Sequence, residues 1–137
     1  MLFSDESYAI RGAVFEVYRQ IGCGFLESVY QDCLQQEFIL RKIPFEAQKK
    51  LPLYYKNELL KSEFIPDFLC YGKIIVELKA ISDTIAVHLA QVQNYLRMTR
   101  LELGLLVNFG HYPGATIERV LNTGYGKGEV YFDNQPE

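Results

Sequence analysis

Cysteine and histidine are scarce in this sequence, and their spacing forms no recognisable framework. Three cysteines, Cys23, Cys33 and Cys70, make no CxxC pair, and the two histidines, His88 and His111, lie far apart. An odd, scattered set of cysteines argues against a disulfide framework, and zinc sites need closely spaced ligands. We therefore expect small buried thiols in a reducing cytosol and no zinc site.

Long apolar runs and excess positive charge are also absent. No run reaches the length of a membrane-spanning helix, and the first ten residues, MLFSDESYAI, lack the features of a secretory signal. We expect a cytoplasmic protein with no membrane partner. The formal net charge is −3, whereas dedicated nucleic-acid-binding domains are usually basic. This balance argues against constitutive tight binding to nucleic acid, but a local basic groove remains compatible with it.

The hydrophobic and charged fractions, 49% and 23%, are typical of one compact globular domain. We expect that domain over residues 1–121 and a Gly-rich polar tail over residues 122–137. Helical periodicity and alternation predict the following elements: helices over residues 5–21, 24–41 and 83–100, and strands over residues 51–55, 59–70, 73–80, 101–109 and 116–121.

Local signals refine the ends of the two N-terminal helices. Ser4 or Asp5 is expected to cap the first helix, and Gly22 to end it. The second helix is expected to bury one apolar face, made of Leu26, Val29, Tyr30, Cys33, Leu34 and Phe38.

The order of elements predicts the fold class. The passage from strand 73–80 through helix 83–100 to strand 101–109 favours a parallel pair joined by a right-handed crossover. The earlier short connections favour antiparallel hairpins, with YKNE as one turn. The sequence therefore predicts an α/β fold with a mixed central sheet flanked by helices.

One predicted buried strand, KIIVELKA over residues 73–80, contains charges. Side chains alternate across a strand, so Ile74, Val76 and Leu78 would face the core while Glu77 and Lys79 share the other face with Ile75. Asp67 lies upstream, with nine residues between it and Glu77. A hairpin turning at Tyr71 and Gly72 would bring the two carboxylates together.

Two interpretations of this charged face remain open. Two close carboxylates repel unless a cation joins them, and Mg²⁺ prefers oxygen ligands. Such a metal acidifies a bound water, and Lys79 could orient or deprotonate that water or neutralise the transition state. Alternatively, Glu77 and Lys79 form an exposed edge pair that contributes little.

The pattern Pro66, Asp67, nine residues, then Glu77, Leu78 and Lys79 resembles the PD-(D/E)XK nuclease superfamily. GCGFLESVY, with Gly24, Glu27 and Tyr30, looks like the motif of its GxxExxY family, and Gln91 with Tyr95 matches the Q-x-x-x-Y spacing of RecB-like nucleases. The resemblance covers residues 8–120 and implies a restriction-endonuclease-like core.

The resemblance also implies roles for residues. Asp67, Glu77 and the Leu78 backbone carbonyl would ligate Mg²⁺ (or Mn²⁺), and Lys79 would be the catalytic lysine. Glu27 would contact the metal through water, and Gln91 would orient the lysine or the substrate. Three further residues are candidate substrate contacts, each with a structural alternative as a packing, capping or surface residue: His88, Tyr95 and Tyr30.

These expectations lead to a metal-dependent nuclease acting on DNA or RNA. The alternative is a catalytically inactive module of the same fold that binds nucleic acid or a protein partner. The apolar edge strand over residues 51–55 could also pair two copies as a homodimer. Six basic residues could contact phosphates or simply form a solvated face: Lys49, Lys50, Lys56, Lys61, Arg97 and Arg100.

Overall fold

The computed structural model describes residues 1–84 and 86–123. The expected Gly-rich tail therefore lies outside the described residues from residue 124 onward. In chain order the elements are α1 (Ser4–Ile21), α2 (Glu27–Leu40), β1 (Phe45–Ala47), β2 (Leu51–Tyr55), β3 (Glu58–Phe64), β4 (Phe68–Cys70), β5 (Ile74–Lys79), α3 (Ala86–Thr99), β6 (Leu103–Asn108) and β7 (Thr116–Leu121).

A five-stranded mixed sheet forms the centre of the fold. Its strand order is β1-β4-β5-β6-β7, and β2 and β3 form a separate two-stranded sheet. The β5–β6 pair is parallel and is connected through α3, while the other pairs are antiparallel. The predicted α/β fold with a mixed sheet flanked by helices is confirmed, including its parallel crossover.

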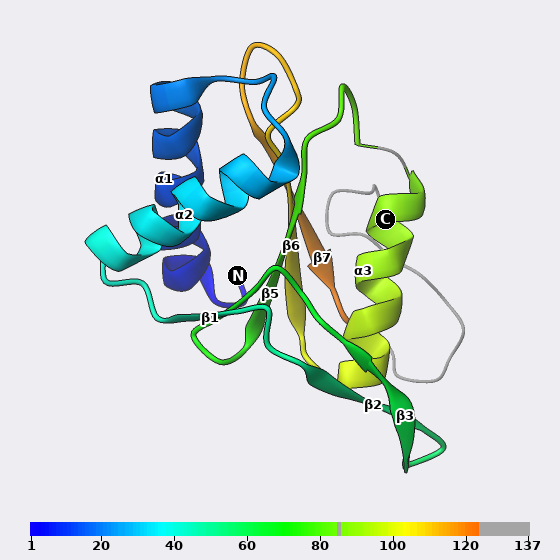
Figure 1. Ribbon diagram of the computed structural model, residues 1–137. Coiled ribbons are helices and arrows are strands. Elements are labelled where there is room, and N and C mark those ends of the chain that lie inside the picture. The colour runs from blue at the N-terminus through cyan, green and yellow to red at the C-terminus, as the bar shows by residue number, and fades with distance from the viewer. Residues whose placement is uncertain (85, 124–137) are drawn as a thin grey trace.

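The sheet separates two apolar layers (Figure 1). Helices α1 and α2 cover one face, while α3 and the β2–β3 hairpin lie on the other. Ile74, Val76 and Leu78 of β5 pack in the larger core beneath α1 and α2. Ile75 packs in the smaller core with residues of α3 and the hairpin. The predicted alternation of β5 is thus confirmed, and both of its faces contribute to a core.

The segment predicted as one strand over residues 59–70 is instead two strands in two sheets. β3 ends at Phe64, and β4 begins at Phe68 after Ile65, Pro66 and Asp67. Pro66 has no N–H to donate to a strand ladder, which favours a break at this point. β4 also pairs with β1, a three-residue strand that the sequence did not predict. The break places Asp67 immediately before β4.

The helix ends differ in part from the prediction. Neither Ser4 nor Asp5 caps α1, because the cap position is Phe3 and no side-chain cap bond forms there. Gly22 does end α1, as predicted, and its N–H donates to the Tyr18 carbonyl. α2 begins at Glu27 rather than near Gly24, whose φ of 111° departs from helical geometry.

Leu26 was expected on the buried face of α2, and this expectation was wrong. It precedes the helix at the cap position, where 77% of its side chain remains exposed. The helical stripe therefore begins one turn later, and Tyr30, Leu34 and Phe38 form its buried part.

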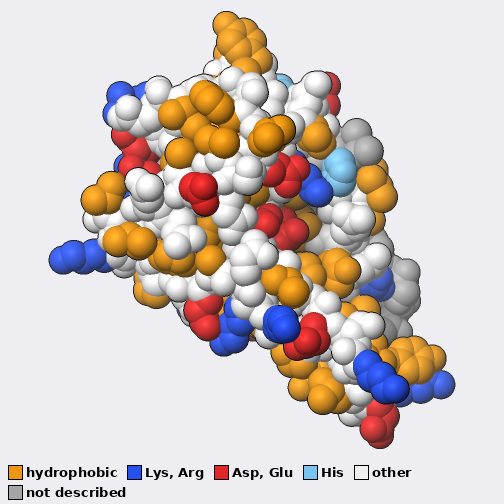
Figure 2. All heavy atoms as spheres, viewed as in Figure 1, with side chains coloured by type: hydrophobic (Ala, Val, Ile, Leu, Met, Phe, Trp, Pro, Cys, Tyr) orange, Lys and Arg blue, Asp and Glu red, His pale blue; other side chains and the backbone are white. Residues whose placement is uncertain are grey.

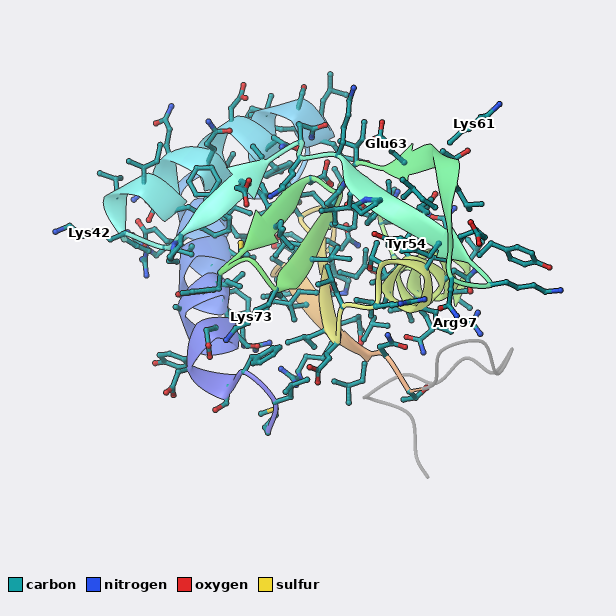
Figure 3. All side chains as sticks on the ribbon, turned by 90° about the horizontal axis from the view of Figure 1, so that it is seen from below. Lys42, Tyr54, Lys61, Glu63, Lys73 and Arg97 are labelled. Carbon is teal, nitrogen blue, oxygen red and sulfur yellow. The ribbon has the colours of Figure 1, made fainter. Side chains whose placement is uncertain are left out.

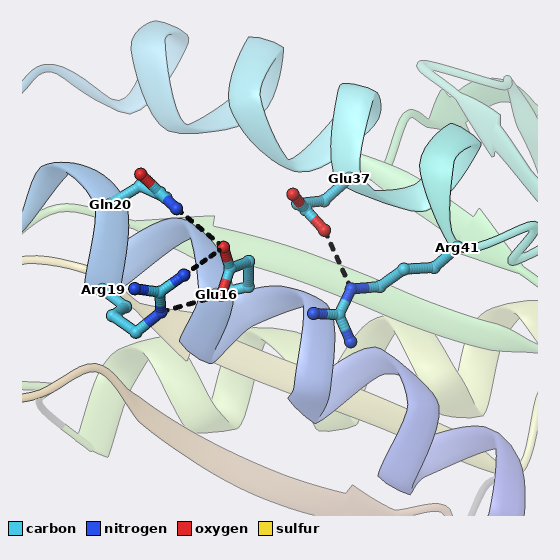
Figure 4. A network of polar contacts seen from close by, with 5 residues as sticks. All are labelled: Glu16, Arg19, Gln20, Glu37 and Arg41. Carbon is cyan, nitrogen blue, oxygen red and sulfur yellow. Dashed lines mark hydrogen bonds and ion pairs between the residues drawn. The ribbon is translucent and has the colours of Figure 1, made fainter.

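Polar pairs cover the outer surface of α1 and α2. Glu16 accepts hydrogen bonds from Arg19 and Gln20, and Glu37 pairs with Arg41 at 2.8 Å (Figure 4). Exposed pairs of this kind contribute little to stability. Their arginines already have carboxylate partners. Among the described residues, no helix is long and apolar enough to cross a membrane.

Candidate metal-binding site

The β4–β5 hairpin brings Asp67 and Glu77 together. Its turn contains Tyr71 and Gly72, both with positive φ, and its register pairs Phe68 with Val76. Asp67 N–H donates to Glu77 Oε1 at 2.8 Å, and Leu78 N–H donates to Asp67 Oδ2 at 2.8 Å. The predicted proximity of the two carboxylates is confirmed. Each is also fixed by a backbone amide of the neighbouring strand.

Lys79 lies two residues after Glu77 at the end of β5. Its positive charge opposes the rise in the pKa values of Asp67 and Glu77, so it lies near both carboxyl groups. In the described part of the chain, the ion pairs join other residues, and none links Lys79 to either carboxylate. Lys79 is therefore close enough to influence the site without being locked to an acid.

Burial disfavours the ionised forms of both carboxyl groups, and the donors and the lysine of the site do not fully offset this effect. The pKa of Glu77 is raised to about 8, chiefly by burial and also by the charges of Asp67 and Glu27, against the opposing effects of the Asp67 N–H bond and Lys79. Burial also raises the pKa of Asp67, opposed by the Leu78 N–H bond, Gln48 and Lys79. An added cation would relieve this repulsion and favour both ionised forms.

Glu27, the first residue of α2, is exposed, and its charge acts on Glu77. The loop that precedes it is held by Tyr30. The Tyr30 hydroxyl donates to the Gly22 carbonyl at 2.5 Å and accepts from Phe25 N–H at 3.3 Å. Tyr30 therefore fixes the chain that leads into Glu27.

The Tyr30 ring is fully buried and stacks on Phe109 with centroids 4.4 Å apart. A side chain in this position offers no open face to a substrate. We therefore leave Tyr30 out of the proposed substrate surface and assign it the structural alternative.

The three predicted α3 positions make no described hydrogen bond or ion pair with the carboxylates. Gln91 is exposed, and Tyr95 stacks on Phe64 of β3 with centroids 3.8 Å apart. His88 is partly buried, and its Nδ1 has no hydrogen-bond partner among the described residues. No described hydrogen bond or ion pair joins these residues to Asp67, Glu77 or Lys79. The structure thus brings together Glu27, Asp67, Glu77 and Lys79. No described hydrogen bond or ion pair connects this group to the predicted residues of α3.

The oxygen atoms of the site fit a hard divalent cation that keeps several waters. Within the described ranges, no three His, Cys, Asp or Glu side chains are grouped as a metal cage. Asp67 and Glu77 nevertheless offer two carboxylates, and Glu77 Oε2 has no described hydrogen-bond partner. Mg²⁺ is commonly bound by one or two carboxylates and water rather than by an all-protein cage.

Charged side chains gather beside a hollow in the middle of the face shown in Figure 2. Acidic groups, a Lys or Arg and a histidine lie close together there, between the regions of α2 and α3.

The basic residues expected to contact phosphates are dispersed. Lys49 pairs with Glu46, and Arg100 bonds to Asn57 while lying over the Tyr54 ring. Figure 3 shows Lys61 and Glu63 both extending from the β3 region, so opposite charges share this hairpin. Two of the six basic residues therefore already have partners, and the hairpin that carries Lys61 also carries acidic side chains.

Sequence reasoning missed two residues that contact Asp67. Gln31 on α2 donates from Nε2 to the Asp67 carbonyl at 3.1 Å, and Gln48 N–H donates to the same carbonyl at 3.2 Å. Gln31 lies four residues after Glu27, so helical spacing could have placed both on one face. Gln48 follows β1, which lacked a strand signal in the sequence.

The comparisons with known proteins support a family assignment. The sequence model described as "PD-(D/E)XK nuclease superfamily" matches residues 4–120. No curated protein matches the chain. A solved structure described as "Crystal structure of SSO0001" is similar at 19% identity with a TM-score of 0.45, over 85% of this chain and 66% of that one. That likeness is too weak to support a functional argument. On the family match, the chain belongs to the PD-(D/E)XK nuclease superfamily.

Proposed function

We propose that this protein is a metal-dependent nuclease that hydrolyses phosphodiester bonds in DNA or RNA, with Mg²⁺ or Mn²⁺ as cofactor. The observation that carries this proposal is the convergence of Asp67 and Glu77, each held by a backbone amide, with Lys79 on the same strand. Membership of the superfamily supports the same activity. The catalytic unit is the domain over residues 1–121.

In this proposal, Asp67, Glu77 and the Leu78 carbonyl hold the cation. When bound, the cation would act as a Lewis acid and lower the pKa of a coordinated water. Lys79 would orient or deprotonate the attacking water, or stabilise charge that develops on the phosphate. Glu27 would contact the cation through a water, since its charge already acts on Glu77.

We also assign the chain to the GxxExxY group within the superfamily. The geometry gives each letter of the motif a physical task. Gly24 adopts a φ of 111° that other residues rarely adopt, Glu27 supplies a carboxylate near Glu77, and Tyr30 ties down the loop between them. These three residues together place and hold the Glu27 carboxylate near Glu77, and this supports the assignment.

The substrate surface would extend from the hollow toward α3. Gln91 and His88 lie on the helix that follows the lysine strand, and Tyr95 packs on Phe64 at the end of β3. We propose Gln91 for orienting lysine or substrate and His88 for a phosphate contact. The unpartnered Nδ1 of His88 supports the second assignment.

The test of the nuclease proposal is cleavage by the purified chain with Mg²⁺ or Mn²⁺, compared with Asp67→Asn. This variant keeps the side-chain shape but removes the negative charge. Asp32→Asn, on the exposed surface of α2, is the matched control. We expect activity in the wild type and control and none in Asp67→Asn. Equal behaviour of all three on single-stranded, double-stranded and structured DNA and RNA would refute the proposal.

A second candidate is a non-catalytic module of the same fold that binds nucleic acid or a protein. The acidic net charge and the dispersed cations favour it. Titration calorimetry with Mn²⁺ distinguishes the two candidates. Saturable binding that Asp67→Asn abolishes supports the nuclease, whereas no binding at millimolar Mn²⁺ by the intact wild type supports the module.

A homodimer would enlarge the modest surface that one chain offers to a nucleic acid. The two-stranded β2–β3 sheet supports this proposal, because it pairs with no other described strand. Sedimentation velocity across a hundredfold concentration range tests it, and a constant monomer mass would exclude it.

A further inference from the structure

We propose that Gln31 is a positioning residue of the candidate site, acting through the backbone of Asp67. The inference rests on the proposed metal-dependent function and adds to it a residue outside the motifs. Gln31 would couple α2, which carries Glu27, to the aspartate of the sheet.

Asp67 is held through each of its polar groups. Its N–H donates to Glu77 Oε1 at 2.8 Å, and its Oδ2 accepts from Leu78 N–H at 2.8 Å. Its carbonyl accepts from Gln31 Nε2 at 3.1 Å and from Gln48 N–H at 3.2 Å. Gln48 Nε2 also lies 3.5 Å from Asp67 Oδ1. One residue thus joins α2, the segment after β1, and β5.

The Gln31 bond is the side-chain connection from α2 to this aspartate. Gln31 and Glu27 are separated by four residues and therefore share one helical face. A shift of α2 would move both Glu27 and the anchor on the Asp67 carbonyl. The helix consequently sets the position of two acids that act on Glu77, one through its own side chain and one through this hydrogen bond.

The chemistry of an amide suits this task. Glutamine donates to a carbonyl without adding charge, whereas a lysine would compete with a cation and a glutamate would repel the site. The carbonyl bond also restrains the residue whose N–H reaches Glu77 Oε1. Holding that N–H fixes the separation of the two carboxylates on which metal binding depends. Partners that orient ligands in this way typically contribute about 10- to 100-fold to metal affinity or activity.

The experiment compares Gln31→Met with Gln36→Met. Methionine has nearly the length of glutamine but no N–H donor, and Gln36 is an exposed residue of the same helix. Three quantities are measured on the full chain: hydrogen exchange of the Asp67 amide by NMR without metal, the Kd for Mn²⁺ by calorimetry, and kcat and KM for cleavage. Thermal melting of each variant shows whether the fold is retained.

We expect Gln31→Met to speed exchange of the Asp67 amide, to weaken Mn²⁺ binding about tenfold, and to lower kcat more than it changes KM. Gln36→Met should match the wild type in all three. Unchanged Asp67 exchange overturns the proposal, and so does faster exchange with wild-type Mn²⁺ affinity and kcat. The exchange measurement needs neither metal nor substrate, so the loss of this anchor is read separately from any failure of the wild type to cleave.

Discussion

The two faces of β5 share one six-residue strand but differ in what surrounds them. Toward α1 and α2, Ile74, Val76 and Leu78 are all buried in the larger core. Toward α3, burial is complete only at Ile75, and the next two positions on that face are the partly exposed Glu77 and Lys79. The apolar layer beneath α3 therefore ends partway along the strand.

This difference shows how a fold prepares a charged site at the point where an apolar layer ends. Glu77 lies where the smaller core ends, so it loses enough water for burial to raise its pKa to about 8, yet it stays partly exposed. The opposite face supplies rigidity, because a strand anchored by three buried side chains holds its backbone amides still. Those amides include Leu78 N–H, which fixes Asp67.

The largest expected effect comes from a substitution on the face of β5 that carries Glu77 and Lys79. Lys79→Met should lower kcat by roughly 10²- to 10⁴-fold, because it removes the proposed general base or charge stabiliser. Its melting temperature should stay near that of the wild type, since Lys79 is locked in no described ion pair. Lys61→Met, on the exposed hairpin, is the control. Equal kcat in the two variants would remove Lys79 from the mechanism.

The second prediction concerns pH and the metal-free protein. The pKa of Glu77 rises from 4.5 to about 8 on folding. At a pH between these two values, Glu77 is ionised in the unfolded chain and protonated in the folded chain. Stability should therefore fall as pH rises from about 5 to about 8, by at most about 5 kcal/mol. Glu77→Gln should flatten this dependence and melt above the wild type at pH 8.

Denaturant unfolding in EDTA across that pH range measures the effect. Glu58→Gln, an exposed change on the hairpin, should keep the wild-type slope. Mn²⁺ should restore stability at pH 8 in the wild type and not in Glu77→Gln, because the ionised carboxylate is the form that binds a cation. A wild-type stability that rises over this interval without metal would contradict the burial of Glu77.

The third prediction concerns the face of β5 that packs beneath α1 and α2. Leu78→Ala should destabilise the protein by about 2–5 kcal/mol, since Leu78 is only 2% exposed and its truncation leaves a cavity. At a temperature where the variant is folded, metal affinity should remain close to wild type, because the main-chain groups of Leu78 are unchanged. Leu59→Ala, at a position 65% exposed, is the control and should cost little. Lost Mn²⁺ binding in folded Leu78→Ala would show that the two faces are not separable.

Sequence reasoning succeeded where one element and its alternation were sufficient. The two faces of β5 follow from a period of two, and the turn at Tyr71 and Gly72 sets the distance from Asp67 to Glu77. The parallel crossover follows from the order of strand, helix and strand. These relations are local along the chain, so a single sequence contains them.

It failed where distant segments decide the outcome. β1 is too short for a periodic pattern, and it exists because β4 offers an edge to pair with. Gln48, which follows it, was therefore invisible as a contact of Asp67. Leu26 has the composition of a core residue but precedes α2 and faces solvent. Tyr30 looked like a core residue from the sequence and was also a candidate substrate contact, and its ring is stacked on Phe109.

The smallest expected effect tests whether Tyr30 acts through the loop before Glu27. Tyr30→Phe keeps the ring on Phe109 but removes the hydroxyl that bonds Gly22 and Phe25, at a cost of about 1–2 kcal/mol. Without these hydrogen bonds the loop before Glu27 is held less firmly, so the Glu27 carboxylate should be less well positioned at the site. We therefore expect kcat to fall a few-fold. The additional effect of Glu27→Gln should then be smaller in the Tyr30→Phe background than in the wild type, because the two residues act in series. Tyr8→Phe, at a position 79% exposed, controls for loss of a hydroxyl. Strictly additive effects of Tyr30→Phe and Glu27→Gln on kcat would separate the tyrosine from the acid and leave it a packing residue alone.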